Sequence, residues 1–384
     1  NPTLTLQSGD VATIPIIEDK IDNVSKVVDS LVEISMGDWD SYETSWDFER
    51  HPLVELRHSV SKVNCPDSWY LKDAFEAWEY QCRLRFDSLK ANEEELNRIF
   101  IGIYGLQDEL TPDVADKDVT VHRIFHTKDD VPESMRGSAY VRTLRDEIVS
   151  LLSYAVGCMF GRYSLDVEGP AYAGGDWDDS KYKTFLPDTD NVIPITDEEY
   201  LEDDIVTCLC GWVKAVYGAD TLEENLDFIA RALGSKGDSS REIIRNYFLK
   251  DFFKDHCKTY QKRPIYWLFD SGKQNGFKAL IYLHRYTPDT IGILRVDYLH
   301  KMQRVYESEI NRMQDMIDNS KNPREVAAST KRKEKLQKQL KECREYDEMI
   351  GHLALSRIQL DLDDGVKVNY EKVQTASDGK KYPV

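Results

Sequence analysis

The sequence predicts a mainly α-helical fold with small β elements, of the α+β class. Most apolar residues recur every three or four positions, which is typical of amphipathic helices with one buried face. Two β-branched and aromatic runs joined by a five-residue loop predict one β-hairpin near 264–286. Helical periodicity on both sides of a turn at Asn322 and Pro323 predicts a long antiparallel helical hairpin near 288–350.

Length and composition restrict the classes of protein that fit. With 384 residues, 41% of them hydrophobic and 31% charged, the chain has room for two or three folded domains. Its formal net charge of −19 disfavours nonspecific attraction to nucleic acid or anionic membranes, so any nucleic-acid contact must come from a local patch. The longest apolar stretch, 151–160, is about half of a membrane span, so no membrane partner is expected. Seven scattered cysteines, with Cys208 and Cys210 as a close pair, indicate reduced thiols in a cytoplasm rather than a zinc site.

The N-terminal part alternates short strands with helices. Residues 3–17 read as one or two short strands, and residues 20–34 read as a helix. A long amphipathic helix is expected over 68–92, because its apolar residues fall on one stripe. Asn92 with Glu95 forms a capping-box pattern, which predicts that a separate short helix begins there.

The composition changes between 163 and 204, where 13 acidic residues face two lysines. This segment is expected to be an acidic linker or a surface excursion. Within the mostly helical region 196–262, three capping-box patterns predict successive helix starts: Thr196 with Glu199, Thr221 with Glu224, and Ser239 with Glu242. The segment 362–373 reads as a turn that leads to a short strand.

No familiar catalytic motif stands out. The glycine-containing stretches 234–240 and 270–273 lack the spacing and the strand-to-helix context of a phosphate-binding loop. The sequence has no GxSxG or HExxH pattern, so covalent catalysis and zinc hydrolysis are unsupported. Asp10, Glu18 and Lys20 resemble the two acids and the lysine of Mg-dependent nucleases, although a solvated helix N-terminus explains the same residues.

The strongest local anomaly is positive charge in 241–286, where ten basic residues face four acidic ones. The Tyr, Trp and Phe residues interleaved with them suit phosphate neutralisation combined with base stacking or groove contact. In the alternative interpretation, lysines at four-residue spacing from Lys250 to Lys262 form a solvated stripe and the aromatic residues lie in the core. His284, on an aromatic strand, suits a structural or ligand-contacting role better than acid–base catalysis.

The predicted helical hairpin is also basic. It carries Lys-Arg-Lys-Glu-Lys at 331–335 and has 12 basic against eight acidic residues over 298–345. Its apolar positions support packing of the two arms on each other. A spacer or a partner surface is the main interpretation, and contact with the DNA backbone is the alternative.

Several of these segments resemble a known family. They are LQDELTP at 106–112, SYAVGCMFGRYSLD at 153–166, NVIPITDEEYLEDDI at 191–205, the long block at 240–286, and LDDGVKVNYEKVQ at 362–374. With these stretches the sequence resembles the C-terminal part of the PglX-like adenine-specific DNA methyltransferases of BREX phage-defence systems, and related fused restriction-modification methylases.

The resemblance implies a parent enzyme that uses S-adenosylmethionine to methylate adenine in duplex DNA. Such an enzyme extrudes the base and holds it against an Asn/Asp-Pro-Pro-aromatic motif. This chain has no such motif, so the catalytic domain is expected upstream of residue 1. No catalytic residue, cofactor or metal is therefore assigned to the chain itself.

Six segments are expected on these grounds. They are the tail of a target-recognition-like unit with a connecting helix (1–35), a helical domain (36–162), the acidic linker or excursion (163–204), helices with the basic β-hairpin (205–287), the helical hairpin (288–352), and a C-terminal strand and tail (353–384).

The leading hypothesis is a noncatalytic region that binds and positions duplex DNA through the basic hairpin. The predicted phosphate contacts are Lys262, Arg263, Lys273, Lys278, His284, Arg285 and Arg295. The alternative is a scaffold that binds other phage-defence proteins without touching DNA. A third and weaker alternative is the Mg-dependent nuclease.

Overall fold

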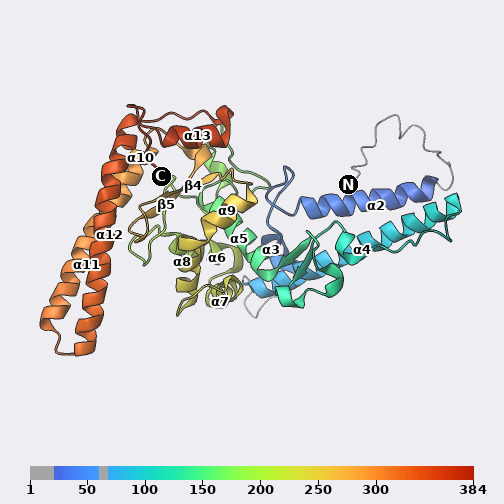
Figure 1. Cartoon of the computed structure of the whole chain (residues 1–384), viewed down its shortest axis with the longest axis horizontal. Coiled ribbons are helices and arrows are strands. Elements are labelled where there is room, and N and C mark those ends of the chain that lie inside the picture. Colours follow the sequence, from blue (N-terminus) through green and yellow to red (C-terminus); the bar gives the residue numbers. More distant parts are fainter. Residues whose placement is uncertain (1–20, 60–67) are drawn as a thin grey trace. The chain divides into compact units, whose positions relative to one another are not determined.

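The computed structural model describes residues 21–59 and 68–384 (Figure 1). The strands expected at 3–17 lie outside the described residues, as do Asp10, Glu18 and Lys20. Tertiary contacts divide the chain into two units, one made of Asn1–Asp40 and Glu79–Thr143 and the other of Ser41–Trp78 and Leu144–Val384. The described residues are mostly helical with two small sheets, which confirms the predicted fold class. Among them, no helix is both long and apolar enough to cross a bilayer.

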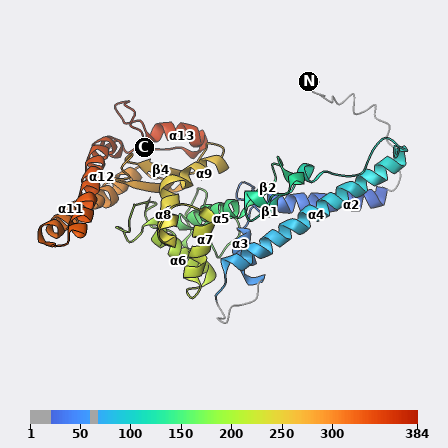
Figure 2. The same ribbon diagram turned by 60° about the horizontal axis from the view of Figure 1, so that its bottom comes forward.

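The first unit is built on α2 (Ile21–Trp39) and on α4 (Leu71–Tyr104) from Glu79 onward, two long helices that lie side by side in Figures 1 and 2. Its smaller elements are η2 (Asp116–Asp118), β1 (Arg123–Phe125), η3 (Lys128–Asp130), η4 (Glu133–Met135) and β2 (Val141–Thr143), with β1 and β2 paired in parallel. The core contains Phe86 and Leu89 of α4.

The helix start predicted at Asn92 is wrong, because α4 runs through this residue. The Asn92 side chain donates to Ser30 Oγ of α2 at 3.1 Å instead of capping a helix.

The second unit contains most of the helices. Before the β-hairpin they are α3 (Pro52–Glu55), η1 (Leu56–Ser59), α5 (Leu144–Met159), η5 (Asp179–Lys181), α6 (Ile205–Tyr217), α7 (Leu222–Leu233), α8 (Ser240–Lys250) and α9 (Phe252–Thr259). Ser239 caps α8 as expected, because its hydroxyl accepts from Glu242 N. Thr196 does not start a helix. Its hydroxyl instead hydrogen-bonds Asp204, which caps the N-terminus of α6 and is paired with the buried Arg245 at 2.7 Å.

The predicted β-hairpin is confirmed. β4 (Tyr266–Asp270) and β5 (Lys278–Tyr282) pair antiparallel, with Tyr266 opposite Tyr282 and Asp270 opposite Lys278. A short strand from the acidic segment, β3 (Ile193–Pro194), adds to the free edge of β5 and gives the order β3-β5-β4. All five residues of β5 are buried, since the sheet is covered by the rest of the unit, and after Tyr282 the chain turns into η6 (Leu283–Arg285).

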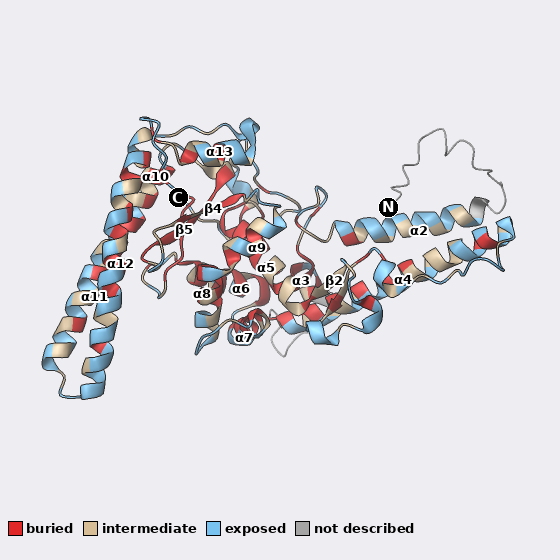
Figure 3. Ribbon diagram, in the orientation of Figure 1, coloured by how far each residue is buried: buried red, intermediate tan, exposed pale blue. Residues whose placement is uncertain are grey.

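The long helical hairpin is also confirmed (Figure 1). It consists of α10 (Thr290–Ile293), a π-helical turn η7 (Leu294–Leu299), α11 (His300–Asn319) and α12 (Pro323–Ser356). Asn322 caps α12 as predicted, with its side chain accepting from Arg324 N at 3.1 Å. Figure 3 shows buried positions along the inner faces of both arms, and Met302, Leu336 and Cys343 belong to the same apolar core as the sheet.

The strand predicted within 362–373 is wrong. After η8 (Leu362–Asp364) the chain forms helix α13 (Gly365–Val373). Val366, Tyr370 and Val373 pack on the apolar core, and their spacing of four and three residues fits one face of a helix. The tertiary packing of these side chains overrides the weak alternation in the sequence.

The acidic segment 163–204 is folded onto the sheet. The amide group of Asn191 donates to Tyr282 O and accepts from Tyr282 N, both at 3.0 Å, so it continues the pairing of β5. Nearby, the Tyr298 hydroxyl lies 2.9 Å from Asp190 and 2.8 Å from Asp203. Burial, and then the neighbouring Asp190, raises the pKa of Asp188 to about 7.

The turn between β4 and β5 is held by a single carboxylate of α12. Glu342 accepts hydrogen bonds from Gly276 N at 3.0 Å, Gln274 N at 2.8 Å and the Ser271 hydroxyl at 2.9 Å. The backbone approaches α12 so closely that a Cβ added at Gly276 would lie 2.7 Å from Gln339 O. The two predicted hairpins are therefore joined at this point.

Replacing Glu342 by Ala is expected to lower the free energy of unfolding by about 2 to 3 kcal/mol, because it removes a charged acceptor from two backbone N–H groups and a hydroxyl. The Glu345→Ala variant on the same helix is the matched control, since Glu345 is exposed and has only a 3.7 Å ion pair with Lys341. Its effect is expected within about 0.5 kcal/mol. Denaturant unfolding measures both variants, and equal effects would contradict a special role of Glu342.

The raised pKa of Asp188 predicts a pH dependence of stability. Folding favours the protonated carboxyl, so the wild-type protein loses stability as pH rises from about 4 to about 7 relative to an Asp188→Asn variant. The Asp178→Asn variant is the control, since the Ser180 hydroxyl donates to Asp178 and lowers the pKa of that carboxyl, so its titration falls below about pH 4 and its curve should stay parallel to that of the wild type above this pH. Thermal midpoints measured from pH 4 to 8 test this, and parallel curves for Asp188→Asn and wild type would refute it.

Candidate functional site

Two of the predicted phosphate contacts, Lys262 and Arg263, lie in the turn between α9 and β4. Gln261 and Lys262 have φ values of +51° and +63°, and Lys262 N donates to Cys257 O at 2.7 Å. This tight turn fixes the backbone while both basic side chains are exposed. Neither forms an ion pair with any residue in 21–59 or 68–384. Both are free to meet an external anion.

Lys273 is exposed too, but it lies in the turn at the other end of the hairpin. Arg263 precedes Tyr266 at one end of β4, whereas Lys273 follows Asp270 at the other. At about 3.3 Å per residue, the strand alone separates the two ends by more than about 13 Å. The turn that carries Lys273 is held by Glu342, whose carboxylate accepts hydrogen bonds from Gln274 N and Gly276 N, just after Lys273.

Lys278 and Arg295 are not available for DNA. Lys278 is buried, and its ammonium group pairs with Asp270 at 2.9 Å and donates to Leu249 O at 3.1 Å. Arg295 pairs with Asp347 at 2.7 Å. Both cations are committed to protein acceptors.

Arg285 also serves the fold. Its guanidinium donates to the backbone carbonyls of Asp188 at 2.7 Å, Thr189 at 3.1 Å and Phe160 at 3.3 Å. It also lies over the Trp177 ring, 4.4 Å from the centroid, which adds a cation–π contact. Arg285 thus ties the acidic segment to the end of the sheet.

His284 carries no charge near neutral pH. Burial, and then the nearby Arg162, lowers its pKa to about 4. Its buried Nδ1 has no hydrogen-bond partner among the described residues. A neutral, half-buried imidazole does not attract phosphate.

Most aromatic residues of the basic segment lie in the core. Tyr266, Trp267, Phe277 and Tyr282 are almost fully buried, so they cannot stack on bases. The stacking part of the DNA hypothesis is wrong for these residues, because the alternating pattern that suggested accessible rings is the pattern of a buried hairpin. What remains of the predicted interface is charge without stacking.

One further exposed cation joins Lys262 and Arg263. Lys258 lies in the last turn of α9, and in the described part of the chain it has no ion-pair partner. Gln261 N donates to Lys258 O at 3.2 Å, so Lys258 is next to the turn that carries Lys262. We name Lys258, Lys262 and Arg263 the α9 cation cluster. In the sequence, Lys258 belongs to the lysines at four-residue spacing that the alternative interpretation assigned to a solvated stripe, and its exposure agrees with that interpretation.

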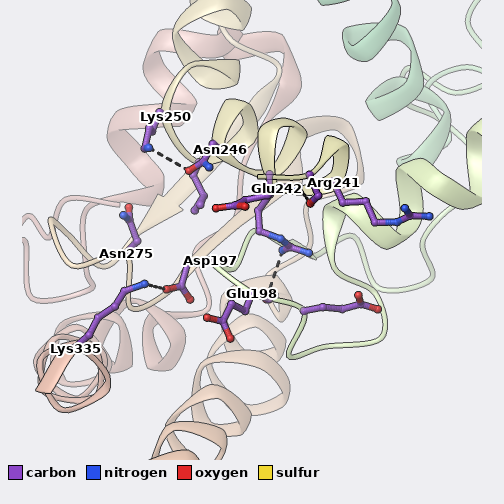
Figure 4. Close-up of a pocket in the computed structure, with 12 residues that line it drawn as sticks. Asp197, Glu198, Arg241, Glu242, Asn246, Lys250, Asn275 and Lys335 are labelled. Atoms are coloured by element: carbon purple, nitrogen blue, oxygen red, sulfur yellow. Dashed lines mark hydrogen bonds and ion pairs between the residues drawn. The ribbon is translucent and has the colours of Figure 1, made fainter. Parts of the chain in front are cut away.

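A polar pocket in the second unit lies between α8, the loop at 197–199, the β4–β5 turn and α12 (Figure 4). Its volume is about 650 Å³. It is lined by Asp197, Glu198, Glu199, Ser239, Arg241, Glu242, Arg245, Asn246, Leu249, Lys250, Asn275 and Lys335. None of these lining residues is aromatic, so the pocket lacks the stacking walls that an extruded base requires.

The charges of this pocket are largely paired. Arg241 forms a bidentate pair with Glu223, with both distances 2.7 Å. Lys335 pairs with Asp197 (Figure 4). Lys335 belongs to the basic run 331–335, in which Arg332 likewise contacts Glu198. The basic run therefore mainly fastens α12 to the loop at 197–199.

A second polar cluster is enclosed in the protein. Arg162 is surrounded by Tyr163, Tyr260, Tyr266 and Tyr282, whose proximity favours its charged form although burial opposes it. Burial raises the pKa of Glu43, and the Ser153 hydroxyl donates to this carboxyl. Glu43, Tyr163, Tyr266 and Tyr282 are buried, and Arg162 and Tyr260 are half-buried, which favours a structural role over contact with a substrate. The described residues also contain no group of three or more His, Cys, Asp or Glu that could hold a metal ion.

The comparisons with known proteins agree on one relationship. The chain is 44% identical over 377 residues to the adenine-specific methyltransferase PglX of Lacticaseibacillus casei (strain Zhang). It is 36% identical over 385 residues to the adenine-specific methyltransferase BrxX of Escherichia coli O9:H4 (strain HS). No protein-family model matches it. Each alignment covers 97% of this chain, which spans about 30% of the length of the curated relatives it matches. Along nearly its whole length the chain is thus similar to a segment of the PglX-like adenine-specific methyltransferases, which confirms the resemblance predicted from its sequence.

Proposed function

We propose that this chain is a noncatalytic region of an adenine-specific DNA methyltransferase of a phage-defence system, and that it helps to bind and position duplex DNA. The parent enzyme uses S-adenosylmethionine, and the cofactor and the extruded adenine are held by a part of the enzyme that this chain does not include. The similarity to PglX and BrxX supports the parent activity.

The observation that carries the DNA contact is the α9 cation cluster. Lys258, Lys262 and Arg263 are exposed, lie within six consecutive residues and are free of ion pairs among the described residues, in a protein of net charge −19. Cations that no carboxylate neutralises are the ones that release counterions from a phosphate backbone. Such contacts fix the protein on the duplex and contribute no sequence discrimination by themselves.

The remaining predicted contacts divide between two roles. Lys273 supplies a second, separate phosphate contact at the far end of the hairpin. Lys278, Arg285 and Arg295 support the fold and so act on DNA only through the position of the hairpin. His284 contributes no charge.

Replacing Lys262 and Arg263 together by Glu is expected to weaken duplex binding by the 384-residue chain and to flatten its salt dependence. The plot of log K against log salt should lose about 0.9 in slope for each phosphate contact removed, or about 1.8 for the pair. Fluorescence anisotropy with a labelled duplex at several salt concentrations measures this slope.

The control for this experiment has the same charge change at another place. Lys72 and Arg231 are exposed and already paired with Glu76 and Asp227, so Lys72→Glu with Arg231→Glu should leave the slope unchanged. An unchanged slope in the Lys262 and Arg263 variant, or an equal loss in the control, would remove the α9 cation cluster from the interface.

A protein scaffold without DNA contact is the second candidate function. It is favoured by the internal pairing of Lys278, Arg285 and Arg295, which leaves the basic segment with fewer free cations than its composition indicates. Specific capture of purified phage-defence proteins by a chain that shows no duplex binding would support this alternative over the first.

A further inference from the structure

One side chain outside the proposed DNA contact is exposed in an unusual way. Trp46 is 97% exposed, whereas Trp78, Trp212 and Trp267 are almost completely buried. A tryptophan contributes a large apolar area, and leaving it in water is unfavourable unless a partner covers it. Trp46 lies in the second unit, in the loop before α3.

The loop presents Trp46 on a fixed support. On one side Ser45 N donates to Tyr42 O at 2.9 Å and Asp47 N donates to Ser45 Oγ at 3.1 Å. On the other side Phe48 is 2% exposed and packs edge-on against Tyr154 and Tyr163. A rigid aromatic side chain loses little conformational freedom when it is covered, which is the property of an interface anchor.

The surroundings of Trp46 are acidic. Asp47 and Glu49 are exposed, and Gly169 N donates to Glu49 O at 2.9 Å, which brings the exposed Glu168 beside them. In the described part of the chain none of these three carboxylates is in an ion pair. Arg50, the nearest cation in sequence, is half-buried and faces Tyr154. The surface around Trp46 therefore has negative charge that no cation in 21–59 or 68–384 pairs with.

We infer that Trp46, Asp47, Glu49 and Glu168 form a docking surface for a protein segment that carries Arg or Lys side chains. The indole face is the best cation–π acceptor among the side chains, and the carboxylates add attraction for the same cation. Duplex DNA does not fit this surface, because three unpaired carboxylates repel phosphate. We name these four residues the Trp46 surface.

Binding of a 12-residue peptide of alternating arginine and glycine to the 384-residue chain tests the inference. A Trp46→Ala variant is expected to bind the peptide at least about fivefold more weakly, a loss of about 1 kcal/mol, because it removes the cation–π contact. The substitution leaves the net charge at −19, so general attraction of the peptide to an acidic protein is unchanged. A separate double variant, Asp47→Asn with Glu49→Gln, is expected to bind the peptide even more weakly than Trp46→Ala does. Its binding should also depend less on salt, because two carboxylates that attract the peptide are removed.

Leu186→Ala is the matched control, since Leu186 is also a well-exposed apolar side chain, and it should leave peptide affinity unchanged. Equal thermal midpoints establish that Trp46→Ala still folds, as its exposure predicts. Unchanged peptide affinity in Trp46→Ala overturns the inference, as does equal binding of an alternating glutamate and glycine peptide. Loss of duplex affinity in Trp46→Ala also overturns it, because the surface would then serve nucleic acid. None of these outcomes depends on the α9 cation cluster.

Discussion

A buried β-hairpin in a largely helical protein must find a partner for every polar group it takes out of water, and the second unit is built around this requirement. β5 is buried along its whole length, so its edge, its turn and its ends are satisfied by other elements. Asn191 pairs with the backbone of Tyr282, β3 completes the edge, and Glu342 accepts from the turn. Segments that are far apart in the sequence are thereby held in one core.

The same requirement explains what happened to the positive charge of the basic segment. Lys278 neutralises Asp270 and donates to a backbone carbonyl, and Arg285 donates to three carbonyls. A long cationic side chain can reach unpaired acceptors at the rim of a buried sheet, and burial of its charge is tolerated because those acceptors are present. Much of the local excess of basic residues is therefore structural. The exposed cations of 241–286 without an ion pair among the described residues are Lys250, Lys258, Lys262, Arg263 and Lys273, and three of these five form the α9 cation cluster.

The two surfaces proposed here have opposite charge. The α9 cation cluster offers unneutralised Lys and Arg, which suits a phosphate backbone, while the Trp46 surface offers unneutralised carboxylates beside an exposed indole, which suits a basic protein segment. Each surface excludes the ligand of the other through charge repulsion.

The sequence by itself determined the fold class, the β-hairpin, the helical hairpin with its cap at Asn322, and the resemblance to PglX-like methyltransferases. These features depend on local periodicity, on turn chemistry and on long specific stretches, all of which are readable without coordinates. Tertiary structure alone decided that α4 continues through Asn92, that α13 is a helix and that the acidic segment supplies β3, because each outcome depends on a contact with a distant residue. It also decided which basic residues are free. Lys262 and Lys278 carry the same charge and lie in the same segment, but Asp270 and Leu249 O lie within reach of Lys278, and no described carboxylate pairs with Lys262.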